Sequence, residues 1–406
     1  MAYLENLRGE PDRKLAWLKI TIAVGFIFSL ALSWRLWISR RLFPLSPVSD
    51  FLPVIPFPLD RILFFLLLAL LLLIIIIARP RKLIRTFLAL AGFLSLFDQT
   101  RWQPWFFQYF FMMAALGLYA WKRPEARNQA ALNACRVIVG FTYVWSGLQK
   151  LNVNFVRETW TDLAGPFLRA FPEVVKSPPP FLILIIPLVE ISIGLGLITR
   201  KYRNVAVILV IATHAFVLIL LISGRANIVV WPWNIAMALF AVILFWQDKD
   251  TCPRRILVPK NAFHALVLIL FGVLPAFSLI GLWDSYLSSA LYSGNTDQAV
   301  IYVSRSVMDR LPEKIQSHVW PSNSIEREPE RFNAEAFCLD IKAWAYDELN
   351  VPGYPEPRVY KRVAEHICTL VKNSGGIKLR IRDRPNPFTG LRGSEYYDCK
   401  QLNSPQ

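Results

Sequence analysis

The sequence predicts an all-α polytopic membrane bundle of about nine transmembrane helices, followed by a small α+β domain outside the membrane. Long apolar runs fill residues 1–283 of the 406-residue chain. The remaining segment, 284–406, has the mixed composition of a soluble domain and is called the tail below. The tail holds 16 basic and 16 acidic residues, so the whole net charge of +16 belongs to the apolar region. This distribution predicts two domains with a boundary at residue 283.

Each predicted helix corresponds to one apolar run. The third and fourth runs are joined by the polar segment Asp98–Pro104. A retained first helix is expected rather than a cleaved signal, because the first run is too long for one. The second run is nearly pure Leu, Ile and Phe, which predicts contact with lipid on most sides. The nine runs are Leu18–Ile38, Ile62–Ala78, Thr86–Phe97, Trp105–Trp121, Ala130–Leu148, Phe181–Thr199, Arg203–Ser223, Ile228–Trp246 and His264–Trp283.

Basic residues predict the orientation of these helices. They gather in alternate loops, which by the positive-inside rule are cytoplasmic. An odd number of helices then places the N-terminus in the cytoplasm and the tail on the extracytoplasmic side of the cell membrane. The lipid bilayer is the expected partner and nucleic acid is not, because the charge lies in short loops and not on a soluble face. The clusters are Arg79/Arg81/Lys82/Arg85, Lys122/Arg123/Arg127, Arg200/Lys201/Arg203 and Lys249/Arg254/Arg255/Lys260.

The tail is expected to combine two strands, Ala299–Ser304 and Gly376–Arg382, with two helices, Asn333–Leu349 and Pro357–Val371. An oxidising compartment permits a disulfide there. Cys338 and Cys368 lie on the two successive helices and are the preferred pair, which leaves Cys399 free. The chain has no CxxC motif and no Cys/His cluster, so no metal site is predicted.

Two ionisable residues lie deep within predicted helices. Glu190 and His214 fall at similar depths on helices joined by a short loop, so the two side chains are expected to meet. Charged groups in hydrocarbon are costly, which makes each a candidate for function. One interpretation is a hydrogen bond that holds two helices together. The other is a pair that transfers protons.

The fifth helix carries a stripe of residues at steps of three and four, which share one face. It consists of Arg136, Gly140, Tyr143, Gly147 and Lys150. The glycines allow a second backbone or a flat ligand to approach closely. Lys150, at the outer end, is either a lysine that extends to the interface or a partly desolvated amine that acts as a base.

Further polar residues are expected at the outer face. One group is Asp98, Arg101 and Trp102 in the segment Asp98–Pro104, and the other is Arg225, Asn227, Trp231, Trp233 and Asn234. The tryptophans suit an interfacial belt better than ligand stacking. Arg35 lies about one turn from a helix end and is expected to extend to the interface.

The segment Tyr143–Phe155, YVWSGLQKLNVNF, resembles the signature of the vitamin K-dependent gamma-carboxylase family. It is also similar to bacterial horizontally transferred transmembrane domain (HTTM) proteins and, more loosely, to the DoxX and MauE families. Asp98–Trp102 resembles the Asp-x-x-x-Trp segment of that family, and Glu190 and His214 fall where such proteins place a membrane Glu and His. Leu291–Gly294 is similar to the start of the outer tail in the bacterial relatives. The resemblance covers roughly residues 86–295.

The resemblance implies a membrane enzyme that binds a quinone or quinol near the outer face. Lys150 occupies the place of the proposed base, and Glu190 and His214 would assist it. The candidate cofactor-binding residues are Tyr143, Gly147 and Arg136 of the stripe, together with Asp98, Trp102 and Asn227 of the groups expected at the outer face. Trp105 stands where the carboxylase has a histidine, and the tail is far smaller than the carboxylase lumenal domain. These departures favour superfamily membership over the same reaction.

The alternative is a non-catalytic membrane subunit or assembly factor of the DoxX/MauE kind, which serves an extracytoplasmic redox partner. A transporter is the least favoured function, because the sequence shows no inverted repeat.

Overall fold

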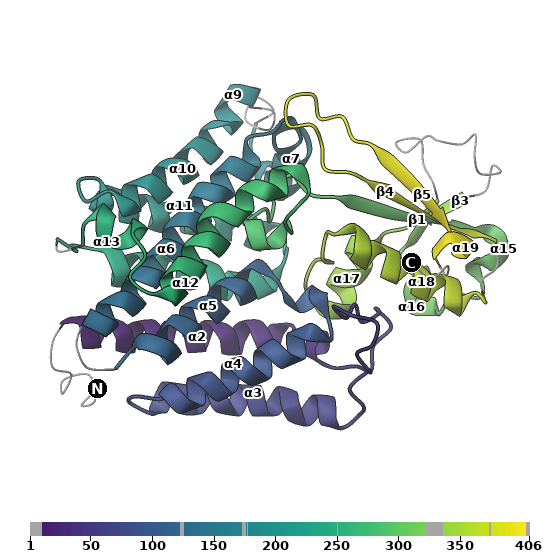
Figure 1. Cartoon of the computed structure of the whole chain (residues 1–406). Helices are drawn as coiled ribbons and strands as arrows, with labels where there is room; N and C mark the ends of the chain where they lie inside the picture. Colours follow the sequence, from purple (N-terminus) through teal and green to yellow (C-terminus); the bar gives the residue numbers. More distant parts are fainter. Residues whose placement is uncertain are drawn as a thin grey trace.

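The chain folds into a bundle of long helices with a small sheet-containing tail at one end (Figure 1), as seen in a computed structural model. The structure describes residues 10–121, 126–172, 176, 178–249, 251–321, 336–372 and 375–402. Six helical segments are long and apolar enough to cross a membrane. They are Pro11–Leu32, Leu59–Ile76, Pro180–Ile198, Arg203–Ser223, Ile228–Phe245 and Ala262–Ile280.

The nine predicted runs all fall on helices, although nine membrane crossings are not confirmed. The three runs outside the six candidates correspond to α4, α5 and α6, of which α4 and α5 have 16 residues each. Sixteen residues at 1.5 Å per residue give about 24 Å, which is short of the roughly 30 Å hydrocarbon core. The long helices are α2 (Glu10–Leu32), α3 (Leu59–Ile76), α4 (Arg81–Leu96), α5 (Pro104–Tyr119), α6 (Ala126–Lys150), α10 (Ile185–Ile198), α11 (Arg203–Ser223) and α12 (Trp231–Phe245).

Shorter helical segments complete the bundle. The last apolar run is divided into α14 (Ala262–Val267), η5 (Leu268–Val273) and η6 (Leu274–Ile280). The others are η1 (Trp34–Trp37), η2 (Gln99–Arg101), η3 (Phe155–Thr159), α7 (Trp160–Leu168), α9 (Pro180–Ile183), η4 (Ile228–Val230), α13 (Pro253–Leu257) and η7 (Tyr286–Ser288).

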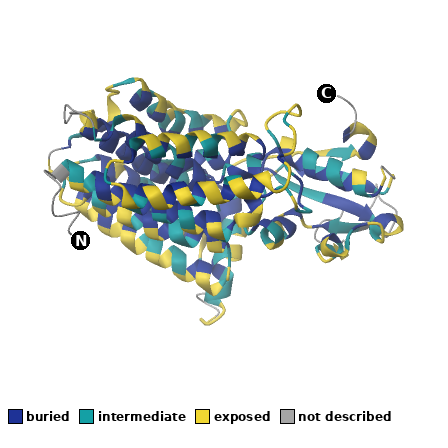
Figure 2. Ribbon diagram, turned by 90° about the horizontal axis from the view of Figure 1, so that it is seen from below, coloured by how far each residue is buried: buried dark blue, intermediate teal, exposed yellow. Residues whose placement is uncertain are grey.

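The interior of the bundle is formed mainly by α5 and α6, whereas α3 and α11 lie at its surface. Most residues of α5 are buried, including the rings of Trp105, Phe106 and Tyr109. Exposed apolar side chains alternate with buried ones along the outer helices (Figure 2). Such exposure suits a lipid-facing surface, because hydrocarbon solvates Leu and Ile side chains that water would not.

The tail contains an antiparallel five-stranded sheet in the order β2-β3-β1-β4-β5. β1 (Gln298–Ser304) lies at the centre, paired with β3 (Ala336–Leu339) and β4 (Ile377–Arg382). β2 (Val319–Pro321) and β5 (Ser394–Asp398) form the edges. The helices are α15 (Arg305–Met308), α16 (Glu313–Gln316), α17 (Ile341–Leu349), α18 (Pro357–Leu370) and α19 (Cys399–Leu402).

The predicted tail helix Asn333–Leu349 is wrong in its first half. Residues 336–339 form β3, and α17 begins only at Ile341, where Asp340 caps it by accepting a hydrogen bond from the Ala343 amide at 2.9 Å. The proposed cap, Asn333, lies outside the described residues. Pairing with β1 and β2 satisfies the backbone of this segment, and local helical spacing cannot reveal such distant partners.

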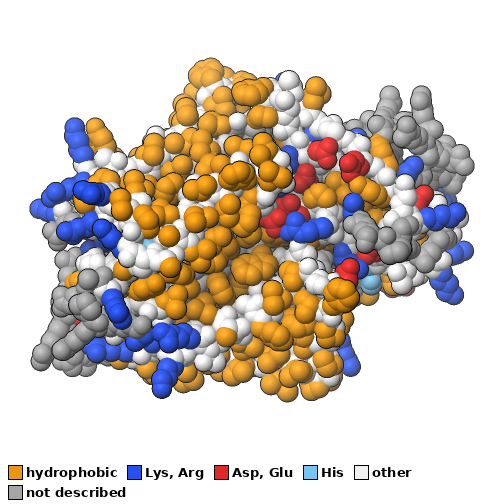
Figure 3. Space-filling view, viewed as in Figure 1, with side chains coloured by type: hydrophobic (Ala, Val, Ile, Leu, Met, Phe, Trp, Pro, Cys, Tyr) orange, Lys and Arg blue, Asp and Glu red, His pale blue; other side chains and the backbone are white. Residues whose placement is uncertain are grey.

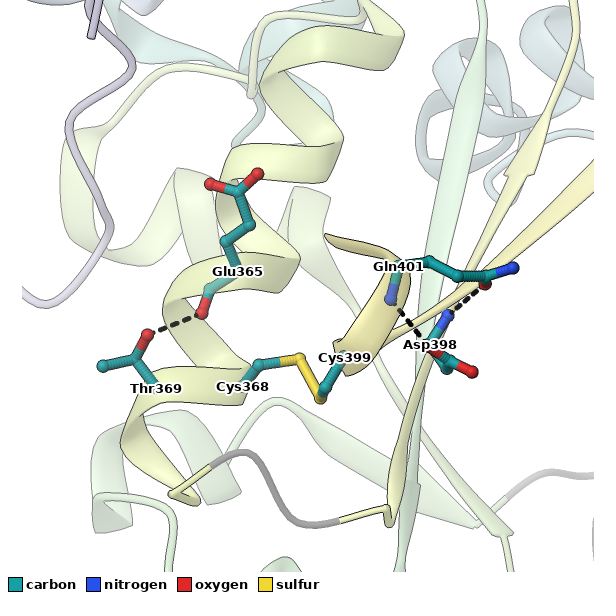
Figure 4. The surroundings of a disulfide bond; sticks show 6 residues. All are labelled: Glu365, Cys368, Thr369, Asp398, Cys399 and Gln401. Carbon is teal, nitrogen blue, oxygen red and sulfur yellow. Dashed lines mark hydrogen bonds between the residues drawn. A yellow bond between two sulfur atoms is a disulfide. The ribbon is translucent and has the colours of Figure 1, made fainter. Parts of the chain in front are cut away.

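The tail disulfide joins Cys368 to Cys399 and not to Cys338 (Figure 4). Consecutive strand residues point to opposite faces of a sheet. Leu339 is buried in the core beneath the helices, so its neighbour Cys338 points to the other face, away from α18. Cys399 begins α19 and packs against the end of α18, where Cys368 lies. The expected Cys338–Cys368 pair is therefore corrected.

Peptide mapping of the unreduced protein should recover Cys368 and Cys399 in one linked fragment and Cys338 as a free thiol. The bridge closes a loop with a sequence separation of 31 residues. A loop of that length restricts the unfolded chain by roughly 3–4 kcal/mol. Cys368→Ser should therefore lower the melting temperature of the protein, whereas Cys338→Ser should leave it nearly unchanged. Recovery of Cys338 in a disulfide would contradict the assignment.

Candidate functional site

The candidate site begins with the close contact of α6 and α10. A Cβ atom at Gly147 would lie 2.5 Å from the Pro187 carbonyl oxygen, and one at Gly194 would lie 2.7 Å from the Gly140 carbonyl oxygen. Neither position accepts a side chain, so glycine permits the two backbones to touch. Of the two alternatives for this glycine face, the structure therefore shows the second backbone. The slot expected for a flat ring beside Gly147 is filled by α10.

This contact brings two opposite charges together inside the bundle. Lys150 Nζ lies 2.7 Å from Glu190 Oε2, and each side chain is only 10% exposed. Lys150 Nζ also donates to Ser146 Oγ at 2.6 Å, one turn earlier on α6. A buried charge without its partner is strongly disfavoured, so the pair must form as a unit. Lys150 is accordingly not an interfacial lysine that extends into water.

His214, on α11, occupies the middle of a separate hydrogen-bond chain. Asn234 Nδ2 donates to the Val230 carbonyl, which leaves Asn234 Oδ1 to accept from His214 Nδ1 at 2.7 Å. A neutral imidazole with its proton on Nδ1 then accepts at Nε2 from the Tyr143 hydroxyl, 2.6 Å away. The amide orientation thus selects the histidine tautomer.

The expected direct contact between Glu190 and His214 is not observed. Within the described part of the chain, Glu190 bonds to Lys150, whereas His214 bonds to Tyr143 and Asn234. Both residues still belong to one neighbourhood, because Glu190 is close enough to act electrostatically on His214 and Tyr143. The geometry therefore places an ion pair beside a Tyr–His–Asn chain.

Two other predicted binding residues lie in structural networks. Asp98 is fully buried, forms an ion pair with Arg41 and accepts from the Thr100 amide at 3.1 Å. Trp102 packs edge-on against Phe106, with ring centroids 5.3 Å apart. These contacts fix the turn between α4 and α5 and do not approach the ion pair.

Arg136 lies on the same helix as Lys150 but near the opposite end. It forms an ion pair with Asp248 at 2.5 Å and donates to the Leu244 carbonyl at 3.0 Å. Fourteen residues separate it from Lys150, about 21 Å along a helix at 1.5 Å per residue. One small ligand therefore cannot contact both residues.

Asn227 lies at the tail side, on the wall of a cavity of about 860 Å³ between the bundle and the sheet. Its backbone is left-handed, with φ of +42°, and its Nδ2 donates to the Tyr292 hydroxyl at 2.7 Å. Among the described residues its buried Oδ1 has no hydrogen-bond partner. The predicted binding residues thus divide among four places, and only Tyr143 and Gly147 adjoin the ion pair.

The lysine segment also anchors the tail to the bundle. Gln149 accepts from Asn295 Nδ2 at 2.6 Å, and Asn152 donates to the Ser293 carbonyl at 2.8 Å. Gly294 has φ of +72°, and a Cβ atom there would lie 2.8 Å from the Phe155 amide nitrogen. The segments Tyr143–Phe155 and Leu291–Gly294 therefore contact each other directly.

A second contact uses Arg384, which bridges two buried carboxylates of the tail and also donates to the bundle. Arg384 Nη2 lies 3.3 Å from Glu356 Oε1, and its Nε lies 3.4 Å from Asp297 Oδ2. Burial raises the pKa of both carboxyl groups, and the guanidinium acts in the opposite direction. Arg384 Nη1 also donates to the Ser278 and Trp283 carbonyls, so this charged cluster of the tail is bonded to the end of the bundle.

No family model, curated protein or solved structure matches this chain.

Sequence reasoning missed two members of the site. Ser146 lies four residues before Lys150, a spacing at which helical side chains meet, so this signal was present. Asn234 was expected with the outer tryptophans, yet its side chain faces His214 within the bundle. Sequence spacing within α12 gives no information about which residue of α11 it meets.

A double-mutant cycle on Lys150→Met and Glu190→Met should show strong coupling. Each single change leaves a buried charge unpaired and should destabilise the fold by about 3–5 kcal/mol, whereas the double change should cost much less than the sum. Chemical denaturation of the purified protein in mild detergent measures the three differences. Thr199→Ala, at the far end of α10, provides the control and should be additive with Lys150→Met. Additivity of the first pair would disprove the ion pair.

Proposed function

We propose that this protein is a membrane-embedded acid–base enzyme of the carboxylase-like/HTTM type that acts on a quinone-like ring. The Lys150–Glu190 pair carries the proposal. An ammonium and a carboxylate 2.7 Å apart in a low-dielectric site can exchange a proton with little rearrangement. Lys150 serves as the base toward the ligand, and Glu190 accepts or returns its proton.

The Tyr143–His214–Asn234 chain supplies a second proton path to the same neighbourhood. A Tyr hydroxyl that donates to imidazole can pass a proton along a preformed hydrogen bond. Because Gly147 is covered by α10, the ligand approaches Lys150 from the Ser146 side or from the outer end of α6, and not along the glycine face.

A second function has its own support in the packing. The Lys150–Glu190 bond joins helices that already touch through Gly147 and Gly194, which is the arrangement of an interhelical clamp. The large cavity between bundle and tail, lined by Asn227 and Tyr292, offers a surface for an extracytoplasmic partner. These features support a non-catalytic subunit of the DoxX/MauE kind.

We further propose that the tail lies on the extracytoplasmic side of the cell membrane. Lys and Arg side chains gather at the end of the bundle opposite the tail (Figure 3), as the positive-inside rule requires of a cytoplasmic face. The Cys368–Cys399 disulfide agrees with an oxidising compartment around the tail.

Quinone analysis of the purified full-length protein distinguishes the two functions. An enzyme should retain about one quinone per chain after mild extraction, and Lys150→Arg should abolish turnover of an added quinol while still inserting normally, because arginine keeps the charge but cannot act as a base. Lys19→Arg, a change at another buried lysine, is the control. Absence of bound quinone, together with full complementation by Lys150→Arg, would support the non-catalytic subunit.

Reporter fusions test the orientation. Fusions after Arg85 and Arg203 should report a cytoplasmic location, and a fusion after Asn295 should report an extracytoplasmic one. A cytoplasmic signal at Asn295 would refute the proposed orientation of the tail.

A further inference from the structure

A second cavity, of about 470 Å³, lies where the segment between α2 and α3 meets α17. Its wall is strongly basic and contains only two carboxylates, those of Asp347 and Glu348. The cationic lining residues are Arg35, Arg40, Arg41, Arg61 and Lys314. This cluster is at the tail end of the bundle, whereas the basic loops that predict the membrane orientation are at the other end. Membrane orientation therefore does not account for it.

The two carboxylates in the wall are already engaged. Glu348 accepts from the Phe43 amide and from Trp344 Nε1, both at 2.9 Å, and Asp347 faces His318 at 3.5 Å. Arg41 is likewise engaged, because it pairs with Asp98. The remaining four cations have no carboxylate within ion-pair distance among the described residues. Even when Asp98, Asp347 and Glu348 are counted against the five cations, the described residues of this cavity keep an excess of positive charge.

Two of these cations contact the same ring, that of Phe57. The guanidinium carbons of Arg40 and Arg61 lie 4.1 Å and 5.1 Å from the centroid of this one ring. Cation–π contacts stabilise each guanidinium, but two like charges that share a ring repel each other. A bound anion would relieve this repulsion, and phosphate fits because guanidinium groups bind its oxygens in pairs.

The surroundings favour a lipid as the source of the phosphate. Exposed apolar side chains flank the cations at the start of α3, among them Phe57 at 43% exposed and Ile62 at 57%. Trp34, also in the cavity wall, is 43% exposed. Aromatic residues at this level suit the headgroup region of a bilayer, and the apolar face of α3 suits acyl chains.

We propose that this cavity binds the phosphate headgroup of an anionic glycerophospholipid. Arg40 and Arg61 hold the phosphate, Arg35 and Lys314 complete the positive wall, and the acyl chains lie along α3. Because Lys314 belongs to the tail and Arg61 to the bundle, the bound lipid joins the two parts of the molecule at the membrane surface.

Native mass spectrometry of the full-length protein, released from micelles with equal amounts of phosphatidylglycerol and phosphatidylcholine, tests the proposal. Wild type should retain phosphatidylglycerol on the order of tenfold more strongly, because its headgroup carries a net negative charge, whereas the choline ammonium of phosphatidylcholine offsets the phosphate charge and is repelled by the arginines. Arg40→Gln combined with Arg61→Gln should remove most of this preference. Arg200→Gln combined with Lys201→Gln, two exposed cations at the opposite end, should leave it unchanged.

Three results would overturn the proposal. They are equal retention of both lipids by wild type, an unchanged preference in the Arg40/Arg61 variant, and thermal stabilisation by inorganic phosphate alone without any lipid preference. The comparison of the two lipids on wild type needs no variant, so the proposal is tested even if glutamine at both positions prevents folding. Arg40→Lys combined with Arg61→Lys, which keeps both charges, should retain part of the preference.

Discussion

The close approach of α6 and α10 is the contact on which the rest of the site depends. Glycine at 147 and 194 lets the two backbones touch, and across this contact Lys150 and Glu190 bond directly. In hydrocarbon the two charges stabilise each other, whereas either alone would be very costly. Packing and electrostatics therefore require the same arrangement, and a side chain at Gly147 would disturb both.

The polar groups of the bundle are arranged by depth. Arg136, Arg203 and Asp248 join helices at the end that bears the basic loops. The ion pair and the Tyr143–His214–Asn234 chain lie nearer the tail. Gln149, which accepts from Asn295, and Asn152, which donates to Ser293, then connect this end of α6 to the tail itself. Acid–base groups are thus enclosed by a folded domain on one side and by helices on the others. Such enclosure strengthens electrostatic interactions, because water is largely excluded.

The tail contributes more than a cover for the helix ends. Phe43 packs against Trp344 with ring centroids 4.9 Å apart, and Asn350 donates to the Leu32 carbonyl. Its helices and the segment between α2 and α3 together form the basic cavity, and its sheet forms one wall of the larger cavity. Both cavities exist only because the tail is docked on the bundle.

The helical bundle, the positions of its apolar helices and two tail strands could all be predicted from the sequence, because hydropathy and residue spacing depend on local order. The sequence also indicated Lys150, Glu190 and His214 as unusual, since charged and polar groups in apolar runs are visible without a structure. The partners of these residues and of the tail cysteines emerge only from the folded chain: Glu190 pairs with Lys150, His214 with Tyr143 and Asn234, and Cys368 with Cys399. Which residues become partners depends on the orientation of each helix about its axis and on the sheet face that a residue occupies. Both are set by packing between segments that are distant in the chain.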